Sequence, residues 1–427
     1  MAAENTAADW EARLSRPSAG ALYVHVPFCV QKCAYCDFPS WATHAGDPLM
    51  VAYVHALESQ LAEASSLGLL DNCTTAYVGG GTPTLLGAEA LGGLVQAVRA
   101  AAPGVAELTS EANPDSLSDD VLAALAAEGA TRLSIGVQSL NDAELVALGR
   151  VHDAQTACER VLAAVDTGLD VSVDLMCATP EQTDALWERT VTSAIELGVG
   201  HVSVYPLSIE DGTPLAERVG DSPCPWNDED VQALRMTRAC ELLLQAGLER
   251  YEVASYAKPG HACAHNEAYW TGVPYLGLGT GASSMLTREG YELLCKACPQ
   301  LPVAPEDARR VRLMVTMGRQ ELTVQPALAA LSFDIEWLSE GQAAAEDLML
   351  GARLVAGLDP GLISHAREVL GVQVVDATFE SLIDDGFLME RAGRLAPTMR
   401  GWLLGNELYG RLWGLASGRV QGAHAGS

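Results

Sequence analysis

The chain has 427 residues, of which 49% are hydrophobic, and its formal net charge is −29. This length predicts about two or three domains. The acidic charge repels phosphate backbones and no run of Lys or Arg offsets it, so no nucleic-acid partner is expected. The N-terminus lacks the basic start and apolar stretch of a secretory signal, and no apolar run is long enough to span a bilayer. A cytoplasmic protein without an integral membrane segment is expected.

Short β-rich runs alternate with longer helical patterns from about Ala21 to Tyr205. The candidate strands are ALYVHV from Ala21, TAYV from Thr75, ELTSEA from Glu107, RLSIGV from Arg132, DVSVDLM from Asp170 and GHVSVY from Gly200. Strands and helices in this alternation predict an α/β fold with a parallel sheet and right-handed crossovers. The pattern alone fits either an open doubly wound sheet or a partial barrel.

The remaining chain predicts a long amphipathic helix from Asn227 to about Ala246 and then a stretch of linker composition, PQLPVAPEDARR. The last part reads as helix, short hairpin and helix, like a winged-helix unit. It has no basic excess, so a structural or partner-docking role is expected for it. The expected units are an N-terminal extension (1–20), an α/β core (21–298), a linker region (299–340) and a smaller helical, winged-helix-like C-terminal domain (341–427).

Three of the 11 cysteines lie close together directly after the first strand, in the sequence PFCVQKCAYCDF. Cys29, Cys33 and Cys36 have the spacing CxxxCxxC, and thiolates are the usual ligands of iron–sulfur clusters. Three cysteines can each hold one iron of a four-iron cubane and leave the fourth iron open for another ligand. The alternative is a zinc site, for which His25 or His44 would supply the fourth ligand.

A glycine run and several polar residues follow the other strands. The run GGGTPT, Gly79 to Thr84, is not a phosphate-binding loop, because no GK[ST] follows it. Its glycines would allow the backbone to approach a ligand closely. Glu111, Gln138 and Asp174 stand near the ends of successive strands, where ligands bind in parallel α/β folds. The glycines of GLGTGASS, from Gly277 to Gly281, imitate a dinucleotide-binding motif, but no βαβ unit follows them.

The chain resembles the coproporphyrinogen oxidase-like branch of the radical S-adenosylmethionine (SAM) superfamily, and within it the HemW family of haem chaperones. The segments that carry the resemblance are LYVHVPFCVQKCAYCDF, GGGTPT, TSEANP, RLSIGVQS, LGRVHD, VDLMCATPEQT, HVSVYPLSIEDGTP, YEVASYAKPG and HNEAYW. The resemblance implies a partial (β/α)6 barrel and a 4Fe-4S cluster on Cys29, Cys33 and Cys36, with SAM on the open iron. The SAM contacts it implies are Tyr23, Tyr35, Gly80, Gly81, Thr82, Glu111, Gln138, Arg150 and Asp174.

Two branches of this group differ in their motifs. Members that resemble oxygen-independent coproporphyrinogen III dehydrogenase extend the motif to CxxxCxxCxC, but this chain has Phe38 at the place of the fourth cysteine. The HemW branch carries HNxxYW, which is matched by His265, Asn266, Tyr269 and Trp270. The resemblance implies that His265 binds haem, since imidazole is a common ligand of haem iron. From the residues alone, a capping histidine beside two core aromatics is the alternative.

The function implied by the resemblance is that of a haem chaperone, which binds haem and transfers it to an acceptor protein. A membrane-associated haem enzyme is among the candidate acceptors. The main alternative is an enzyme of porphyrin biosynthesis that decarboxylates coproporphyrinogen III oxidatively, so enzymatic activity stays open. Radical modification of tRNA is a third possibility, which the acidic charge disfavours.

The sequence departs from the family pattern in two places. Ala178 replaces the glycine of the segment DLxxGxPxQT, and its methyl group would crowd a close backbone approach there. Cys295 and Cys298 form a second CxxC motif beyond the matched core. An incidental surface pair is favoured for them over a metal or redox pair.

Overall fold

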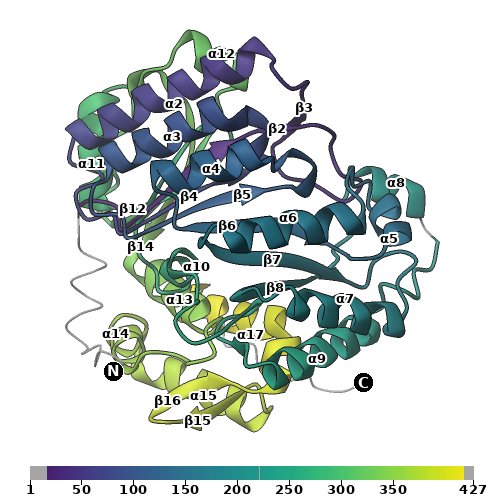
Figure 1. Ribbon diagram of the computed structural model, residues 1–427. Helices are drawn as coiled ribbons and strands as arrows, with labels where there is room; N and C mark the ends of the chain where they lie inside the picture. The colour runs from purple at the N-terminus through teal and green to yellow at the C-terminus, as the bar shows by residue number, and fades with distance from the viewer. Residues whose placement is uncertain (1–16, 221, 418–427) are drawn as a thin grey trace.

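The computed structural model describes residues 17–220 and 222–417, and a twelve-stranded sheet is its central element (Figure 1). The strands from β11 to β8 in the spatial order are parallel, and antiparallel strands extend the sheet at both ends. In spatial order they are β14 (Phe333–Ser339), β13 (Ala308–Val315), β12 (Ser283–Thr287), β11 (Tyr275–Leu278), β1 (Ala21–Val26), β4 (Thr75–Gly80), β5 (Glu107–Ala112), β6 (Arg132–Gln138), β7 (Asp170–Cys177), β8 (His201–Pro206), β10 (Ser255–Ala257) and β9 (Glu249–Arg250).

The six strands predicted from the sequence are all present, and the partial barrel is the correct one of the two predicted architectures. The helices that connect these strands lie on the outer face of the sheet (Figure 1). They are α2 (Pro48–Ser66), α3 (Gly87–Ala101), α4 (Asp119–Glu128), α5 (Asp142–Ala147), α6 (Ala154–Asp166), α7 (Asp184–Glu196), α8 (Pro214–Val219) and α9 (Glu229–Gln245). Their ends follow local signals, as in α4, where the Ser118 side chain caps the start and Gly129, at φ 98°, forms the end.

Alternation along the parallel strands separates an apolar outer face from a polar inner face. Leu133 and Val173 belong to the hydrophobic core between the sheet and its helices. Ser134 and Ser172, which are paired across β6 and β7, point to the opposite side. The inner face of the barrel is therefore a polar lumen, and the candidate site lies at its open end.

The prediction of a linker over 299–340 was wrong, because this segment contributes β13 and β14 to the main sheet. Within the sequence ARRVRLMV of β13, residues 310–313 alternate between arginine and an apolar residue, and β13 pairs with β12 and β14 on either side. Proline-rich composition just before β13 conceals this strand pattern. The short helix α12 (Arg319–Val324), which lies between β13 and β14, packs against α2.

The C-terminal unit is mainly helical and has a hydrophobic core of its own, which includes Phe379, Leu382 and Leu408. Its elements are α13 (Glu340–Gly351), α14 (Pro360–Leu370), α15 (Val372–Asp384), the hairpin of β15 (Leu388–Arg391) and β16 (Arg394–Pro397), α16 (Met399–Leu403) and α17 (Gly405–Gly414). Buried ion pairs join this unit to the sheet, where Arg310 of β13 contacts Glu346 at 2.5 Å and Asp347 at 2.7 Å.

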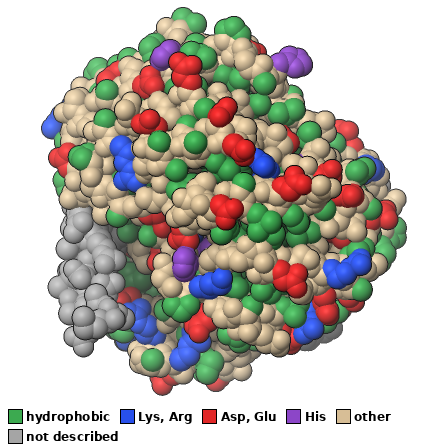
Figure 2. Space-filling view, in the orientation of Figure 1, with side chains coloured by type: hydrophobic (Ala, Val, Ile, Leu, Met, Phe, Trp, Pro, Cys, Tyr) green, Lys and Arg blue, Asp and Glu red, His purple; other side chains and the backbone are tan. Residues whose placement is uncertain are grey.

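Most of the predicted N-terminal extension, residues 1–16, lies outside the described residues. Among the helices that are described, none combines the length and the apolar character needed to cross a membrane. On the face shown in Figure 2, acidic side chains are spread among neutral ones, and basic side chains lie singly or in small groups. This is the charge distribution of an ordinary solvated surface.

Candidate functional site

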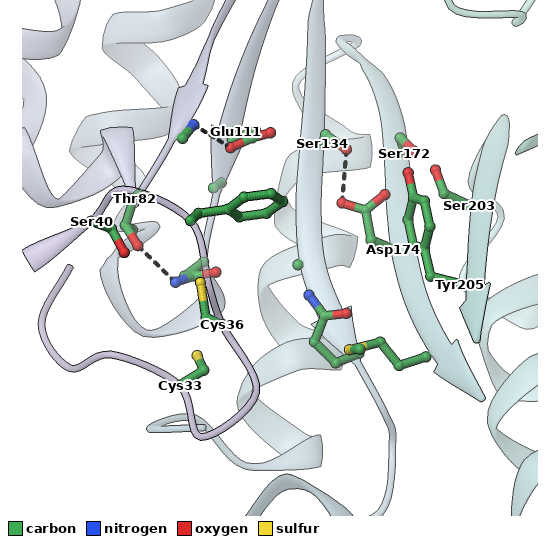
Figure 3. A pocket seen from close by; sticks show the side chains of 18 of the residues that line it. Cys33, Cys36, Ser40, Thr82, Glu111, Ser134, Ser172, Asp174, Ser203 and Tyr205 are labelled. Atoms are coloured by element: carbon green, nitrogen blue, oxygen red, sulfur yellow. Dashed lines mark hydrogen bonds between the residues drawn. The ribbon is translucent and has the colours of Figure 1, made fainter. Parts of the chain in front are cut away.

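The three clustered cysteines line one cavity of about 430 Å³ at the open end of the barrel (Figure 3). Cys29 belongs to the short strand β2 (Phe28–Cys29), which pairs with β3 (Trp41–Ala42). The loop that carries the cysteines is anchored to the barrel at Ala34, whose N–H donates to the carbonyl of Leu148 at 2.9 Å. The Arg150 guanidinium donates to the Cys33 sulfur at 3.4 Å. The loop is thus held with its thiols toward the cavity.

The donor set fits an iron–sulfur cluster. Burial raises the pKa values of the Cys29 and Cys36 thiols, so a strongly positive ligand is needed to stabilise their thiolates. In the part of the chain that is described, no three His, Cys, Asp or Glu side chains converge tightly enough for a single metal ion. In a cubane, by contrast, each thiolate binds a different iron. Zinc gains no support here, since neither His25 nor His44 lines the cavity.

The glycine run after β4 packs directly against the strand that begins the cysteine loop. The N–H of Gly81 donates to the Val26 carbonyl at 2.8 Å, and the N–H of Thr82 donates to the Phe28 carbonyl at 2.7 Å. A Cβ atom on Gly81 would lie 2.7 Å from the Phe28 carbonyl oxygen. The close approach that requires glycine here is therefore an approach to the chain's own backbone, although Gly80, Gly81 and Thr82 also line the cavity.

Two buried carboxyl groups face the cysteines across the cavity (Figure 3). Glu111 accepts hydrogen bonds from the Gly80 N–H at 2.8 Å and from the Tyr77 hydroxyl at 2.9 Å, and burial raises its pKa to about 7. Asp174 accepts from the Ser134 hydroxyl at 3.1 Å, and burial raises its pKa to about 6. These two groups bring acidic oxygens into the cavity that Arg150 also lines.

Arg150 and Gln138 complete the polar wall. The Arg150 guanidinium is buried and donates to the Asn113 side-chain oxygen at 2.7 Å and to the Gly136 carbonyl at 2.6 Å. Gln138 lies at the end of β6 with φ 64°, where the pairing of β6 with β7 shifts register. A cation and two carboxyl groups in one cavity suit a ligand that carries both a carboxylate and an ammonium group, such as an amino acid moiety.

Most of the predicted site residues come together in this cavity. Its lining includes the three cysteines and Tyr35, Gly80, Gly81, Thr82, Glu111, Gln138, Arg150 and Asp174. Tyr23, which the resemblance implies as a SAM contact, does not line it. Its hydroxyl donates to Nδ1 of His25 at 2.8 Å, and its ring lines a second cavity on the neighbouring part of the sheet. The strand that carries Tyr23 was predicted correctly, and its ring points to this second cavity.

His265 is the other residue that the structure places elsewhere. It is 1% exposed, and burial lowers its pKa to about 3. Its Nδ1 is 3.0 Å from the Thr75 hydroxyl and its Nε2 is 3.2 Å from the Tyr269 hydroxyl. With both ring nitrogens occupied inside the protein, His265 is not arranged as an open ligand for haem iron in this structure. His265 is a core histidine among aromatic rings here, and its side chain caps none of the described helices, so the alternative of a capping histidine was wrong.

Sequence reasoning missed the polar residues deeper in the lumen. Beneath the cysteines the same cavity is lined by residues from the inner faces of β4 to β8, among them Tyr77, Thr109, Ser134, Ser172, His201, Ser203 and Tyr205. The signal that could have found some of them is alternation, because β5 and β7 each place a polar residue two positions before a predicted site residue. Glu111 and Thr109 on β5, and Asp174 and Ser172 on β7, are such pairs.

The two departures from the family pattern have different outcomes. Ala178 adopts φ 58°, a left-handed conformation that favours glycine, so the alanine sits in a strained position. Cys298 is buried, and its sulfur lies 3.1 Å from the Leu328 carbonyl oxygen. The prediction of an incidental surface pair was therefore wrong for Cys298, because this residue packs in the core. Gly277 lies in β11, and Gly279 and Gly281 lie in the turn that leads to the antiparallel strand β12, so no βαβ unit follows these glycines, as expected.

The buried Glu111 carboxyl predicts a dependence of stability on pH. Its pKa is raised from 4.5 to about 7, so the folded chain prefers the protonated form. This contribution to stability is fully present below about pH 4.5 and is lost as the pH rises through about 7. Between about pH 4.5 and pH 8, the free energy of unfolding of the native chain should fall by roughly 3 kcal/mol relative to Glu111→Gln. Urea unfolding of both proteins measures it, and a difference that does not vary with pH would contradict the assignment.

Comparison with known proteins defines the class. Residues 23–194 match the family model of the radical SAM superfamily, and this segment contains the cysteine loop, the glycine run and both buried carboxyl groups. The solved structure described as coproporphyrinogen III oxidase from Escherichia coli, a radical SAM enzyme, has the same fold, with a TM-score of 0.72 at 21% identity over 96% of this chain and 93% of that one. The fold and the cysteine loop are those of a radical SAM protein.

Curated relatives narrow the class further. The heme chaperone HemW of Mycobacterium tuberculosis is 34% identical over 398 residues, which cover 92% of this chain and 94% of the relative. The heme chaperone HemW of Escherichia coli is 38% identical over 272 residues, which cover 62% of this chain and 70% of the relative. The chain belongs to the HemW family of radical SAM proteins.

Proposed function

We propose that the protein is a haem chaperone, which binds haem and transfers it to an acceptor protein while it carries a SAM-bound 4Fe-4S cluster. The observation that carries the proposal is the pair of adjoining cavities. One has three thiols facing two buried carboxyl groups, and the other is lined mainly by aromatic and aliphatic side chains. The relatives that match most of the chain are named heme chaperones.

The residues that line the first cavity would have different roles in binding the cluster and SAM. Cys29, Cys33 and Cys36 would hold the cluster, which when reduced supplies an electron to SAM. Arg150 would orient the carboxylate of SAM, and Glu111 or Asp174 would accept from its ammonium group. The polar residues of the lumen would keep the remainder of the ligand hydrogen-bonded away from solvent.

The acceptor and the location belong to the same proposal. A membrane-associated haem enzyme is proposed as the acceptor, because such an enzyme needs a carrier that can deliver a poorly soluble cofactor. A cytoplasmic location is proposed because all 11 cysteines are free thiols, which fits a reducing compartment.

The test uses the complete chain, purified without oxygen and loaded with its cluster. Haem is titrated in while the Soret band is followed, and a saturable change at about one haem per chain is expected if the second cavity holds one haem. The same preparation is then incubated with SAM, a reductant and coproporphyrinogen III, and no decarboxylated product is expected. Decarboxylation at a catalytic rate would instead identify the protein as an enzyme of porphyrin biosynthesis.

A further inference from the structure

A second cavity of about 460 Å³ lies beside the first one, between the sheet and two helices. Its wall includes Tyr269 and Trp270 of α10 (Ala264–Trp270), Tyr275 of β11, Met285 of β12, Arg312 of β13 and Leu350 of α13. Phe38, Gly80 and Glu111 line both cavities, so the two spaces adjoin at the glycine run. A ligand in the second cavity would therefore lie next to the ligand of the first.

The register of the sheet explains why these side chains meet. Tyr275 pairs with Met285 across β11 and β12, and Met285 pairs with Arg312 across β12 and β13. Paired residues share a face of the sheet, so the three side chains form a row on the same inner face as the barrel lumen. The helices α10 and α13 contact each other and cover this row (Figure 1).

The cavity has the chemistry of a site for a flat aromatic ligand. Aromatic rings and aliphatic chains form most of its wall, and a space of this volume is typical of small-molecule sites. Tyr269 and Tyr275 meet edge to face, with ring centroids 4.6 Å apart, which makes a rigid corner. The one arginine in the wall, Arg312, is paired with Glu336 at 2.9 Å and with Glu346. A planar ligand core that is neutral once it is bound is expected.

Among the tyrosine hydroxyl groups that line this cavity, that of Tyr275 differs from the others. The hydroxyl of Tyr23 donates to His25, whose Nε2 in turn lies 2.9 Å from the Pro39 carbonyl oxygen. The Tyr269 hydroxyl is bonded to His265. The Tyr275 hydroxyl, by comparison, makes no hydrogen bond with any other residue that the structure describes.

We propose that this cavity is the haem site and that the Tyr275 phenolate is the ligand of the haem iron, an inference that rests on the proposed chaperone function. Tyrosine is an established ligand of haem iron in proteins. On binding, the O–H bond of Tyr275 breaks, an Fe–O bond forms to ferric iron, and the proton passes to solvent. The positive charge of the ferric haem core and the negative charge of the phenolate then cancel, which suits an apolar cavity.

The electrostatic surroundings of Tyr275 agree with this role. Burial raises the pKa of its hydroxyl, while the nearby guanidinium groups of Arg312 and Arg310 act in the opposite direction. Two cations beside a buried phenol favour the phenolate once ferric iron binds it. Both arginines are themselves held by ion pairs to the C-terminal unit.

In this proposal, His265 of the HNxxYW segment is not the ligand of the haem iron and has a different role. His265 stacks on Tyr77, with ring centroids 5.1 Å apart, and it holds the Tyr269 hydroxyl. Tyr269 in turn packs against Tyr275. His265 is thus a positioning residue for the wall of the haem site.

The test is a titration of the cluster-loaded full chain with ferric haem, comparing Tyr275→Phe with the matched control Tyr269→Phe. The native chain should show a high-spin ferric spectrum with a tyrosinate-to-iron charge-transfer band. Tyr275→Phe should lose that band and bind ferric haem about tenfold or more weakly, because an iron ligand is removed. Tyr269→Phe removes a hydroxyl from the same wall and should keep the band. The absorbance of the 4Fe-4S cluster, recorded before haem is added, shows that each variant is folded.

Each outcome has one meaning. If the native chain binds haem but Tyr275→Phe leaves the spectrum unchanged, the ligand assignment is wrong while the chaperone function stands. A spectrum that changes in Met285→Leu or His265→Ala, but not in Tyr275→Phe, would move the iron ligand to that residue. If the native chain binds no haem at all, the proposed function itself fails.

Discussion

Replacing Cys33 with alanine is expected to abolish the visible absorbance of the reconstituted cluster while the fold survives. Cys33 is only half buried, lies in a loop and is not part of the hydrophobic core, so its removal leaves no large void. It nevertheless supplies one of three thiolates, and the Arg150 guanidinium contacts its sulfur. Loss of one ligand leaves two cysteines, which cannot hold three irons of a cubane.

Iron and sulfide analysis after anaerobic reconstitution, together with circular dichroism, measures this effect. Cys224→Ala is the matched control, since Cys224 is also half buried and lies outside the cavity. The control should bind as much iron as the native chain. Full cluster absorbance in Cys33→Ala would mean that the cluster has been assigned to the wrong residues.

Replacing Gly81 with alanine is the second change with a large expected effect. The added methyl group would meet the backbone of Phe28 and Val26 at 2.7–2.8 Å, and backbone atoms there cannot move without displacing β2. Overpacking of this kind costs about 1–3 kcal/mol of stability. Because β2 carries Cys29, the cluster loop shifts as well, and incomplete cluster loading is expected.

Gly93→Ala is the control for this substitution. Gly93 lies within α3, and a methyl group there would meet only the Glu58 side chain at 3.6 Å. Alanine in a helix interior is more stable than glycine by roughly 0.5–1 kcal/mol, so this variant should be slightly stabilised and fully loaded. Equal cluster content and equal unfolding midpoints for the two alanine variants would contradict the packing argument.

Much of the fold could be predicted from the sequence because its signals are local. The parallel strands appear in the sequence as short apolar runs between helical patterns. The antiparallel strands β13 and β14 were harder to predict. Residues 299–340 were expected to be a linker because prolines precede β13, while the alternation of arginines with apolar residues in β13 is the stronger signal. β14 lies at the edge of the sheet, and an antiparallel strand there needs less hydrophobic sequence than a central parallel strand, so composition underrates it.

Some residues of the candidate site could likewise be predicted from the sequence, and others could not. Glu111, Gln138 and Asp174 could be placed because the ends of parallel strands meet at one edge of a sheet. Tyr23 and His265 could not, because their positions depend on which hydrogen-bond partners the folded chain brings to them. His265 meets Thr75, which lies 190 positions away in the sequence. Tyr275 belongs to none of the sequence motifs, and its proposed role rests on its position in the second cavity.

The central claim is that haem passes directly from this protein to an acceptor, and the rate of transfer tests it. The haem-loaded chain is mixed either with membranes that contain haem-depleted enzymes or with apomyoglobin, which only captures haem that has dissociated. The account predicts that the membranes acquire haem faster than apomyoglobin does, and that the rate rises with membrane concentration. Equal rates in both mixtures, independent of the concentration of the acceptor, would mean passive release and would contradict a chaperone function.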